Sequence, residues 1–294
     1  MGKIYEALEK ATQDRHGPEE KEKSRRGPAS EQRGSHQRVL GHAQGQAEEA
    51  NGELVVLGRP GSIIAEHFRF LRSRICRPLR GDNPRTVLIT SALQGEGKTF
   101  VASNLAATIA QGLDEHVLLV DADLRNPRLH SIFNLSDENK GLSTHLQDNE
   151  PLQNLMHKTT IPKLTVLPAG FSSQKPAELI SSSRMKKFII EVRYRYPDRY
   201  VIFDSSPIEL SPETAHVANE VEGIFLVLRR AQTPRETAKS TIEKFKKEQF
   251  LGVILNGYNR AAKYYKYKKK GYYNYCYPYG QNKLNEKESE HASS

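Results

Sequence analysis

Residues 91–99 read SALQGEGKT, a pattern typical of a loop that binds phosphate groups. A short apolar strand precedes this segment and a helix rich in Ala and Leu follows it, which is the context that a Walker A loop requires. The glycines let backbone N–H groups approach phosphate oxygens, and the N-terminus of the helix adds a partial positive charge. We predict that Lys98 reaches the β- and γ-phosphates and that Thr99 offers its hydroxyl to Mg²⁺. The nucleotide contacts are expected from Gln94, Gly95, Glu96, Gly97, Lys98, Thr99 and Phe100.

Carboxylates follow two further predicted strands. Asp121 and Asp123 come directly after the apolar run at 116–120, and Asp204 follows the run at 200–203. In an open α/β sheet, ligands bind at the carboxyl ends of the strands, so we expect the three carboxylates to gather around the phosphate loop. Mg²⁺ beside phosphates needs one or two carboxylates, and a nucleophile needs a base or an orienting acceptor. One such aspartate is more often a turn or helix-cap residue, but three at this edge predict a catalytic and metal site.

A tyrosine cluster lies near the C-terminus, where eight of the thirteen tyrosines fall within sixteen residues. A folded core has little use for such a run, because each buried hydroxyl needs a hydrogen-bond partner. No Asp or Glu occurs between Glu248 and Glu286, and lysines are interleaved with the first tyrosines. Read alone, the cluster is either a surface for single-stranded nucleic acid or another polyanion, or a substrate. Its members are Tyr264, Tyr265, Tyr267, Tyr272, Tyr273, Tyr275, Tyr277 and Tyr279.

Short apolar runs alternate with helical segments through the middle of the chain. Strands are predicted at 87–90, 116–120, 164–167, 200–203, 224–228 and 251–255, and the clearest helices at 61–77 and 99–112. This alternation predicts a mostly parallel sheet covered on both faces. We therefore expect an α/β fold, a three-layer sandwich like that of P-loop NTPases.

The two ends of the 294-residue chain have a different composition. The mean hydropathy of −0.66 and the hydrophobic fraction of 37% indicate much sequence outside a core. We predict a short N-terminal helix plus disordered linker at 1–52, a P-loop ATPase or kinase domain at 53–260, and a flexible tyrosine-rich tail at 261–294. The amphipathic segment at 2–13 is as well explained by a frayed end as by a docking helix.

Composition also limits the class of protein. No apolar run approaches the ~20 residues of a membrane helix, and the N-terminus lacks the features of a signal peptide, so we expect a cytoplasmic protein. The isolated Cys76 and Cys276 argue against a disulfide framework, structural zinc or an iron–sulfur cluster. The net charge of +9 is concentrated at the two ends and near residue 70, which favours local interaction patches over a duplex-binding face.

In its phosphate loop, its aspartates and its tyrosine cluster, the sequence resembles the bacterial tyrosine kinases (BY-kinases) of capsule and exopolysaccharide assembly, and in particular their stand-alone cytoplasmic form. The resemblance covers roughly Glu53 to the C-terminus. SALQGEGKT matches the Walker A motif, LLVDADLRNP the second acidic motif and VIFDSSP the Walker B motif. The opening MGKIYEALEKA resembles members from exopolysaccharide loci. An oligomerisation motif is matched by Glu66, Arg69 and Arg72, and the terminal tyrosine cluster is matched as well.

The resemblance implies an ATP- and Mg²⁺-dependent protein-tyrosine autokinase that regulates polymer assembly and export. Asp121 would orient or deprotonate the incoming tyrosine hydroxyl, and Arg125 would balance the acidic cluster. Thr99, Asp121, Asp123 and Asp204 would hold Mg²⁺ directly or through water. A head-to-tail ring would deliver the tail of one protomer to the site of its neighbour. The implied partners are a membrane-embedded polysaccharide co-polymerase, which recruits the kinase to the inner face of the plasma membrane, and a phosphotyrosine phosphatase; no nucleic acid is expected.

Two positions depart from the family pattern, and two other functions stay open. Ser205-Ser206-Pro207 stands where Thr-Pro-Pro is common, and Glu213 stands where an Asp is usual.

The adenine site is poorly specified, with Asn256 and Arg260 as candidates. One alternative is a MinD/ParA-like positioning ATPase, although such proteins typically carry a lysine at the position of Leu93. The other is a nucleotide-binding regulator without transferase activity, with a polyanion-binding tail.

Overall fold

The computed structural model describes residues 53–78, 83–135, 140–170, 175–196 and 198–257. The chain divides into two compact units, Met1–Asn256 and Gly257–Ser294. Only Gly257 of the second unit falls within the described residues, so the structure presented below is that of the first. The predicted N-terminal helix and linker, Arg260 and the tyrosine cluster lie outside the described residues.

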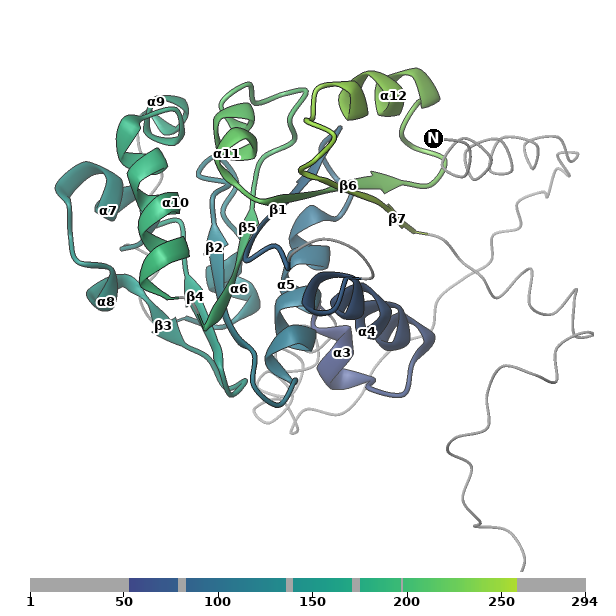
Figure 1. The fold of residues 1–294 in the computed structure, drawn as a ribbon, viewed down its shortest axis with the longest axis horizontal. Coiled ribbons are helices and arrows are strands. Elements are labelled where there is room, and N and C mark those ends of the chain that lie inside the picture. Colours follow the sequence, from purple (N-terminus) through teal and green to yellow (C-terminus); the bar gives the residue numbers. More distant parts are fainter. Residues whose placement is uncertain (1–52, 79–82, 136–139, 171–174, 197, 258–294) are drawn as a thin grey trace, which may run out of the picture. The chain divides into compact units, whose positions relative to one another are not determined.

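Seven strands of the described residues form one sheet in the order β3-β4-β2-β5-β1-β6-β7 (Figure 1). All neighbouring strands are parallel except β3, which runs antiparallel to β4. Each of the six predicted strands is confirmed to within one residue at either end. The strand β3 was not predicted, because two residues are too short to display a periodicity. The strands are β1 Thr86–Ser91, β2 His116–Asp121, β3 His157–Lys158, β4 Leu164–Leu167, β5 Arg199–Asp204, β6 Gly223–Arg229 and β7 Phe250–Asn256.

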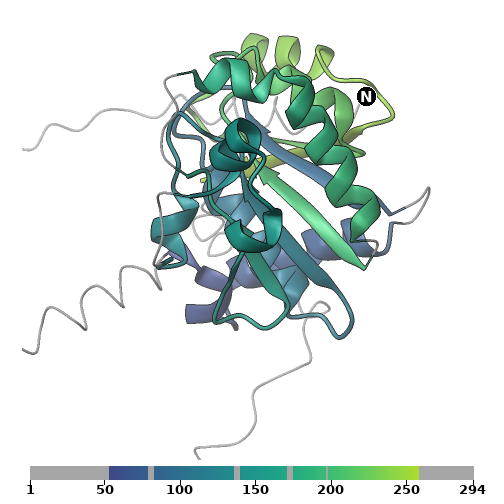
Figure 2. The ribbon, with the colours of Figure 1, turned by 90° about the vertical axis from the view of Figure 1, so that its left-hand side faces the viewer.

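Helices cover both faces of this sheet, as Figures 1 and 2 show. The helices α3, α4 and α5 lie on one face, and α9, α10, α11 and α12 on the other. The α/β three-layer arrangement predicted from the alternation is therefore confirmed. The helices are α3 Val55–Gly58, α4 Ile63–Cys76, α5 Lys98–Ala110, α6 Leu129–Ile132, α7 Leu142–Asp148, α8 Leu152–Leu155, α9 Pro176–Ile180, α10 Ser183–Arg195, α11 Thr214–Glu220 and α12 Arg235–Glu243.

The central strands are apolar because they are buried on both sides. All six residues of β1 are buried, with Val87 and Ile89 in the core on the α4–α5 face and Leu88 in the core on the α10 face. Parallel sheets with two covered faces read as continuous apolar runs rather than as alternating ones. Polar groups therefore accumulate where the strands end, at the edge that holds the phosphate loop and the aspartates.

Helix α4 packs against α5, the helix that follows the phosphate loop. Ser62 caps its N-terminus by accepting a hydrogen bond from the N–H of Ala65, at 3.2 Å. Phe68 and Ile75 are buried against the core, as the helical spacing predicts. Ile63 and Ile64 share that spacing but are 62% and 46% exposed. The buried part of the helix therefore begins only at Ala65.

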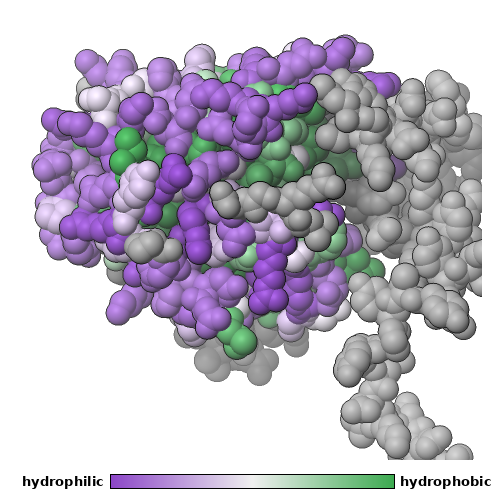
Figure 3. Space-filling model, viewed as in Figure 1, coloured by the Kyte–Doolittle hydropathy of each residue, from purple (hydrophilic) through white to green (hydrophobic). Residues whose placement is uncertain are grey.

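The face of the described residues seen in Figure 3 is mostly polar, and an apolar area lies below α12 over β6 and β7. Half-buried side chains of β7, among them Val253 and Leu255, pack there against buried Leu226 and Leu228 of β6. Within the described ranges, none of the helices combines the length and the apolar character needed to cross a lipid bilayer.

Candidate active site

The phosphate loop connects the end of β1 at Ser91 to the start of α5 at Lys98. Gly95 and Gly97 have positive φ angles of 81° and 90°, a conformation that side-chain-bearing residues rarely adopt. A Cβ atom at Gly97 would lie 2.1 Å from Nδ2 of Asn256, so the Asn256 side chain would have to move to admit one. Gly97 is also the N-cap of α5 and offers no capping side chain. The first N–H groups of α5 thus lie at a tight, side-chain-free turn, which is suited to binding an anion.

A buried carboxylate supports this loop from within. Glu96 is fully buried, and its Oε2 accepts a hydrogen bond from the N–H of Leu93 at 2.6 Å. Its Oε1 accepts hydrogen bonds from the hydroxyl of Thr233 and, at 3.4 Å, from the N–H of Arg229. The Arg229 guanidinium in turn donates to the carbonyl oxygen of Gly95 at 2.8 Å. The loop is thereby fixed to the segment between β6 and α12, and Glu96 can offer a nucleotide its backbone rather than its carboxylate.

The three predicted carboxylates lie together, because β2 and β5 are neighbours in the sheet. Asp121 and Asp204 are register partners at the ends of these strands. Asp123, two residues further along, forms an ion pair with Lys98, with 2.9 Å between Oδ2 and Nζ. All three aspartates are buried, so the predicted catalytic lysine and carboxylates form a single cluster at the edge of the sheet.

Asp121 is bound on both oxygens by backbone N–H groups. Oδ1 accepts from Asp123 at 3.2 Å, and Oδ2 accepts from Arg128 at 3.0 Å and Leu129 at 3.1 Å. These bonds anchor the start of α6 to the end of β2. Burial raises the pKa of Asp121 well above its ordinary value, and the neighbouring charge of Asp204 raises it further. A carboxylate in such a place is a stronger base than one in water.

Asp204 has an oxygen that the protein does not satisfy. Its Oδ1 is buried and, among the described residues, has no hydrogen-bond partner. Burial raises the pKa of Asp204 to about 7, although the charge of Lys98 and a hydrogen bond from Thr99 oppose the shift. An orphaned carboxylate oxygen beside the Thr99 hydroxyl is a suitable ligand for a hard cation. No group of three or more His, Cys, Asp or Glu residues in the described ranges is arranged to hold a metal unaided, so such a cation would also need phosphate oxygens.

Besides Lys98, two arginines in or just after the acidic motif have different partners. Arg125 forms an ion pair with Glu213, with 2.8 Å between Nε and Oε1, and its side chain is 45% exposed. Arg128, which the sequence reasoning missed, binds Asp121 through its backbone N–H, and its charge lowers the pKa of Asp204, while its guanidinium lies 3.4 Å from Oε1 of Glu53. The only feature of the sequence that pointed to Arg128 is its position immediately after the acidic motif LLVDADLRNP. Ser206, also missed, donates a hydrogen bond to Oδ1 of Asp123 at 2.6 Å.

The predicted oligomerisation residues lie along α4. Arg69 and Glu66 form an ion pair with each other, and both side chains are partly exposed. Arg69 also donates to the carbonyl oxygen of Pro60 at 2.6 Å. Arg72 donates to the carbonyl oxygen of Thr108 on α5 at 3.3 Å. The motif is therefore partly engaged within its own chain.

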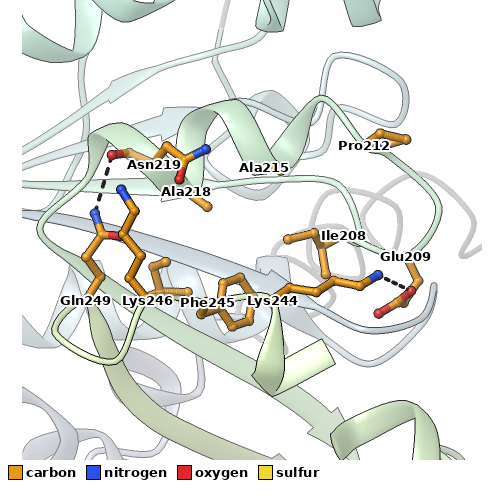
Figure 4. Close-up of a pocket in the computed structure, with 11 residues that line it drawn as sticks. Ile208, Glu209, Pro212, Ala215, Ala218, Asn219, Lys244, Phe245, Lys246 and Gln249 are labelled. Atoms are coloured by element: carbon orange, nitrogen blue, oxygen red, sulfur yellow. Dashed lines mark hydrogen bonds and ion pairs between the residues drawn. The ribbon is translucent and has the colours of Figure 1, made fainter. Parts of the chain in front are cut away.

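A cavity of about 270 Å³ lies apart from this cluster, between α11 and the segment that joins α12 to β7 (Figure 4). Apolar side chains such as Ile208, Ala218 and Phe245 line its middle. One end is closed by the ion pair of Lys244 with Glu209, and the other by Gln249 donating to the carbonyl oxygen of Asn219 (Figure 4). No predicted site residue lines this cavity, so its chemistry is separate from that of the carboxylates.

The strand order, the loop geometry and the position of Lys98 define a P-loop nucleotide-binding protein. A family profile described as "AAA domain" agrees, matching residues 85–219. The chain is 34% identical to the tyrosine-protein kinase YwqD of Bacillus subtilis over 222 residues, which span 75% of this chain and 90% of YwqD. The chain therefore belongs to the bacterial tyrosine kinases, as its motifs predicted.

Solved structures agree with this assignment. The kinase domain of the Escherichia coli tyrosine kinase ETK superposes with a TM-score of 0.65 at 27% identity, covering 78% of this chain and 84% of that domain. The chimerical protein CapA2B2 superposes with a TM-score of 0.63 at 31% identity, covering 69% of this chain and 89% of the chimera. The septum site-determining protein MinD of Pyrococcus horikoshii, complexed with Mg-ADP, shares only the fold, with a TM-score of 0.51 at 24% identity over 60% of this chain and 72% of MinD.

Proposed function

We propose that this protein is a Mg·ATP-dependent tyrosine autokinase that phosphorylates its own C-terminal tyrosine cluster, largely between protomers. The observation that carries the proposal is the single cluster of Lys98, Asp121, Asp123 and Asp204 at the edge of the sheet beside the phosphate loop. Phosphoryl transfer requires mainly positioning and charge neutralisation, and this cluster supplies groups for both.

The residues present fit ATP and Mg²⁺. The side-chain-free turn at Gly95 and Gly97 suits the phosphates, and the unsatisfied Oδ1 of Asp204 beside Thr99 suits a hard cation. Thr99, Asp204 and Asp123 would hold the ion, with Asp121 as a further ligand or as the group that orients the tyrosine hydroxyl. When bound, Mg²⁺ neutralises charge on the phosphate oxygens. Lys98 would exchange its bond to Asp123 for one to the phosphates, and Arg125 would act near the rim through Glu213.

The acceptor is proposed to be the tyrosine cluster at 264–279, entering the site of a neighbouring protomer. The composition supports this, because a lysine-rich segment without Asp or Glu is attracted to an acidic pocket. Each phosphotyrosine adds roughly 1.5 to 2 negative charges, so multiple phosphorylation would drive the tail out of the pocket. The exposed ion pair of Glu66 and Arg69 on α4 supports the proposed head-to-tail ring, since these side chains could exchange partners between copies.

Anti-phosphotyrosine blotting of purified wild type and two variants tests the proposal. Wild type is expected to carry phosphotyrosine, and Lys98→Met to carry little or none. A truncation after Arg260 should still bind ATP but lack phosphotyrosine. A wild-type signal no stronger than that of Lys98→Met would contradict the kinase activity. A phosphorylated truncation would contradict the tail as acceptor.

The cellular role proposed is regulation of capsule or exopolysaccharide polymerisation and export from the cytoplasmic face of the plasma membrane. A membrane-embedded co-polymerase would activate the kinase and a phosphotyrosine phosphatase would reset it. The support is the motif pattern together with the similarity to CapA2B2, a chimerical protein. Co-purification of the full chain with a membrane protein encoded in the same locus, lost on deletion of residues 1–52, would test the recruitment.

A positioning ATPase is the second candidate, and the fold shared with MinD favours it. Leu93 weighs against it, because its side chain supplies no cation to the nucleotide, while its N–H binds Glu96. Steady ATP hydrolysis without phosphotyrosine would favour this candidate. ATP binding with neither hydrolysis nor phosphotyrosine, together with salt-sensitive binding of the tail to oligonucleotides, would favour a non-catalytic regulator.

A further inference from the structure

Ser206 forms a hydrogen bond that no motif predicts. Its hydroxyl donates to Oδ1 of Asp123 at 2.6 Å, and both residues are buried. The same carboxylate uses its other oxygen, Oδ2, for the ion pair with Lys98 at 2.9 Å. Its remaining hydrogen bond comes to Oδ1 from the N–H of Asn126 at 3.2 Å. The hydroxyl of Ser206 and the N–H of Asn126 therefore fix the rotation of the Asp123 carboxylate from one side, and Lys98 binds it from the other.

Ser206 is itself held from two sides. Its carbonyl oxygen accepts hydrogen bonds from the hydroxyl of Thr90 on β1, at 2.9 Å, and from that of Thr214 on α11, at 3.2 Å. The hydroxyl thus projects from backbone that is bonded to two elements of the core. Because the backbone of Ser206 is fixed in this way, its hydroxyl can restrict the orientation of the Asp123 carboxylate.

We infer that Ser206 is a positioning residue that holds Asp123 in the orientation required to bind Mg²⁺. The inference rests on the proposed function, in which Asp123 is a ligand of the ion. Carboxylate ligands are oriented by the groups that hydrogen-bond to them, and removing such a group typically costs 10–100-fold in metal affinity or activity. The hydroxyl acts on the carboxylate and not on the phosphate loop, so nucleotide binding in the absence of metal should change much less than the Mg²⁺ requirement.

Ser205 provides a matched control. It is the preceding residue, is also buried, and donates its hydroxyl to the carbonyl oxygens of Ile89 at 3.2 Å and of Ser206 at 3.3 Å instead of to a carboxylate. Ser205→Ala therefore removes a buried hydroxyl of the same strand end without changing Asp123. Ser206→Thr keeps the hydroxyl. A small cavity lined by Ser206, Leu124, Ile180 and Val217 lies beside this side chain.

The experiment measures binding of a fluorescent ADP analogue to the full-length protein, first in EDTA and then across a Mg²⁺ titration. Ser206→Ala should raise the Mg²⁺ concentration for half-maximal enhancement roughly 10-fold, with affinity in EDTA within about threefold of wild type. Ser206→Thr and Ser205→Ala should behave as wild type. Thermal unfolding in EDTA establishes that each variant is folded.

Asp123→Asn separates the failure of this inference from that of the proposed function. If Asp123→Asn raises the Mg²⁺ requirement and Ser206→Ala does not, the role of Ser206 is overturned and the metal assignment stands. If neither variant changes it, both are overturned. In the Asp123→Asn background, Ser206→Ala should have no additional effect, because the two side chains act as one unit. Additive effects would show that Ser206 acts on some other group, and would also overturn the inference.

Discussion

The Nζ atom of Lys98 lies 2.9 Å from Oδ2 of Asp123, so the lysine of the phosphate loop is paired with a carboxylate of the neighbouring strand end. The lysine is 12% exposed and the aspartate 2% exposed, which keeps water from weakening the pair. A phosphate group that binds to the loop must compete with Asp123 for this cation.

This competition predicts opposite effects of Asp123→Asn on two kinds of nucleotide binding. Without metal, the variant should bind ADP several-fold more tightly than wild type, because Lys98 no longer has an anionic partner within the protein. With Mg²⁺ the advantage should disappear, because a proposed metal ligand is lost. Isothermal titration in EDTA and in saturating Mg²⁺ measures both. Weaker binding than wild type in EDTA would contradict the competition.

Gly97→Ala should abolish nucleotide binding and destabilise the fold by at least about 1 kcal/mol. The φ angle of 90° is unfavourable for alanine, and its Cβ would collide with Nδ2 of Asn256. Urea unfolding measures the stability, with Gly61→Ala as control, because a Cβ at Gly61 meets nothing within 4 Å. Adding Asn256→Ala should restore part of the stability by removing the collision. Full nucleotide affinity in Gly97→Ala would contradict the geometry of the loop.

Thr233→Val should raise the KM for ATP while leaving most of the structure intact. The substitution keeps the shape of the side chain but removes the hydroxyl that donates to the buried Glu96 carboxylate. An unsatisfied buried charge costs roughly 1–3 kcal/mol or more, which the loop can relieve by moving. Thr237→Val is a matched control, since the Thr237 hydroxyl makes no hydrogen bond to the phosphate loop in the described structure. Equal KM values for the two variants would show that the Glu96 contact does not position the loop.

The pKa of Asp204 predicts a pH dependence of stability in the metal-free protein. In the unfolded chain this carboxyl titrates near 3.8, whereas in the folded state its pKa is about 7, because the side chain is buried. Between these values the folded state binds more protons, so this group lowers the free energy of unfolding as the pH rises from about 4 to 7. Above pH 7 the effect is complete.

Asp204→Asn removes this titration and provides the measurement. In EDTA the variant should be more stable than wild type at pH 8, and the difference in unfolding free energy should shrink as the pH falls towards 4. The same protonation predicts that Mg²⁺-dependent nucleotide binding by wild type weakens below pH 7, since the ion requires the carboxylate. A pH-independent stability difference between the two proteins would contradict the shifted pKa.

Much of the fold could be predicted from local patterns. Six strands were located to within one residue, because strands buried on both faces are written as uninterrupted apolar runs such as Val87–Ile89 and Val117–Val120. The convergence of Asp121 and Asp204 could also be foreseen, because all parallel strands end at the same edge of a sheet. The exposure of Ile63 and Ile64 could not be foreseen. Periodicity shows which residues of a helix form an apolar stripe, but it does not show where along the helix the neighbouring helix begins to cover that stripe.

The sequence by itself determined the class of chemistry. The glycines and lysine of the phosphate loop, the aspartates after β2 and β5 and the order of strands and helices are all short-range patterns, because each follows from the backbone or charge requirements of a few consecutive residues. They were sufficient to predict a P-loop NTPase-like fold and the members of its acidic cluster, whereas the kinase activity was indicated by the resemblance to the bacterial tyrosine kinases.

Only the tertiary structure decided the partners within that cluster. Glu96 turns inward to Thr233, Arg125 pairs with Glu213, and Ser206 holds Asp123, across 137, 88 and 83 residues of sequence. Such contacts depend on which strands are neighbours and on how the loops between them pack, and neither is encoded in local spacing. The charge and type of a residue indicate that its polar group needs a hydrogen-bond or ionic partner, but the arrangement of strands and loops in the folded protein determines which residue is that partner.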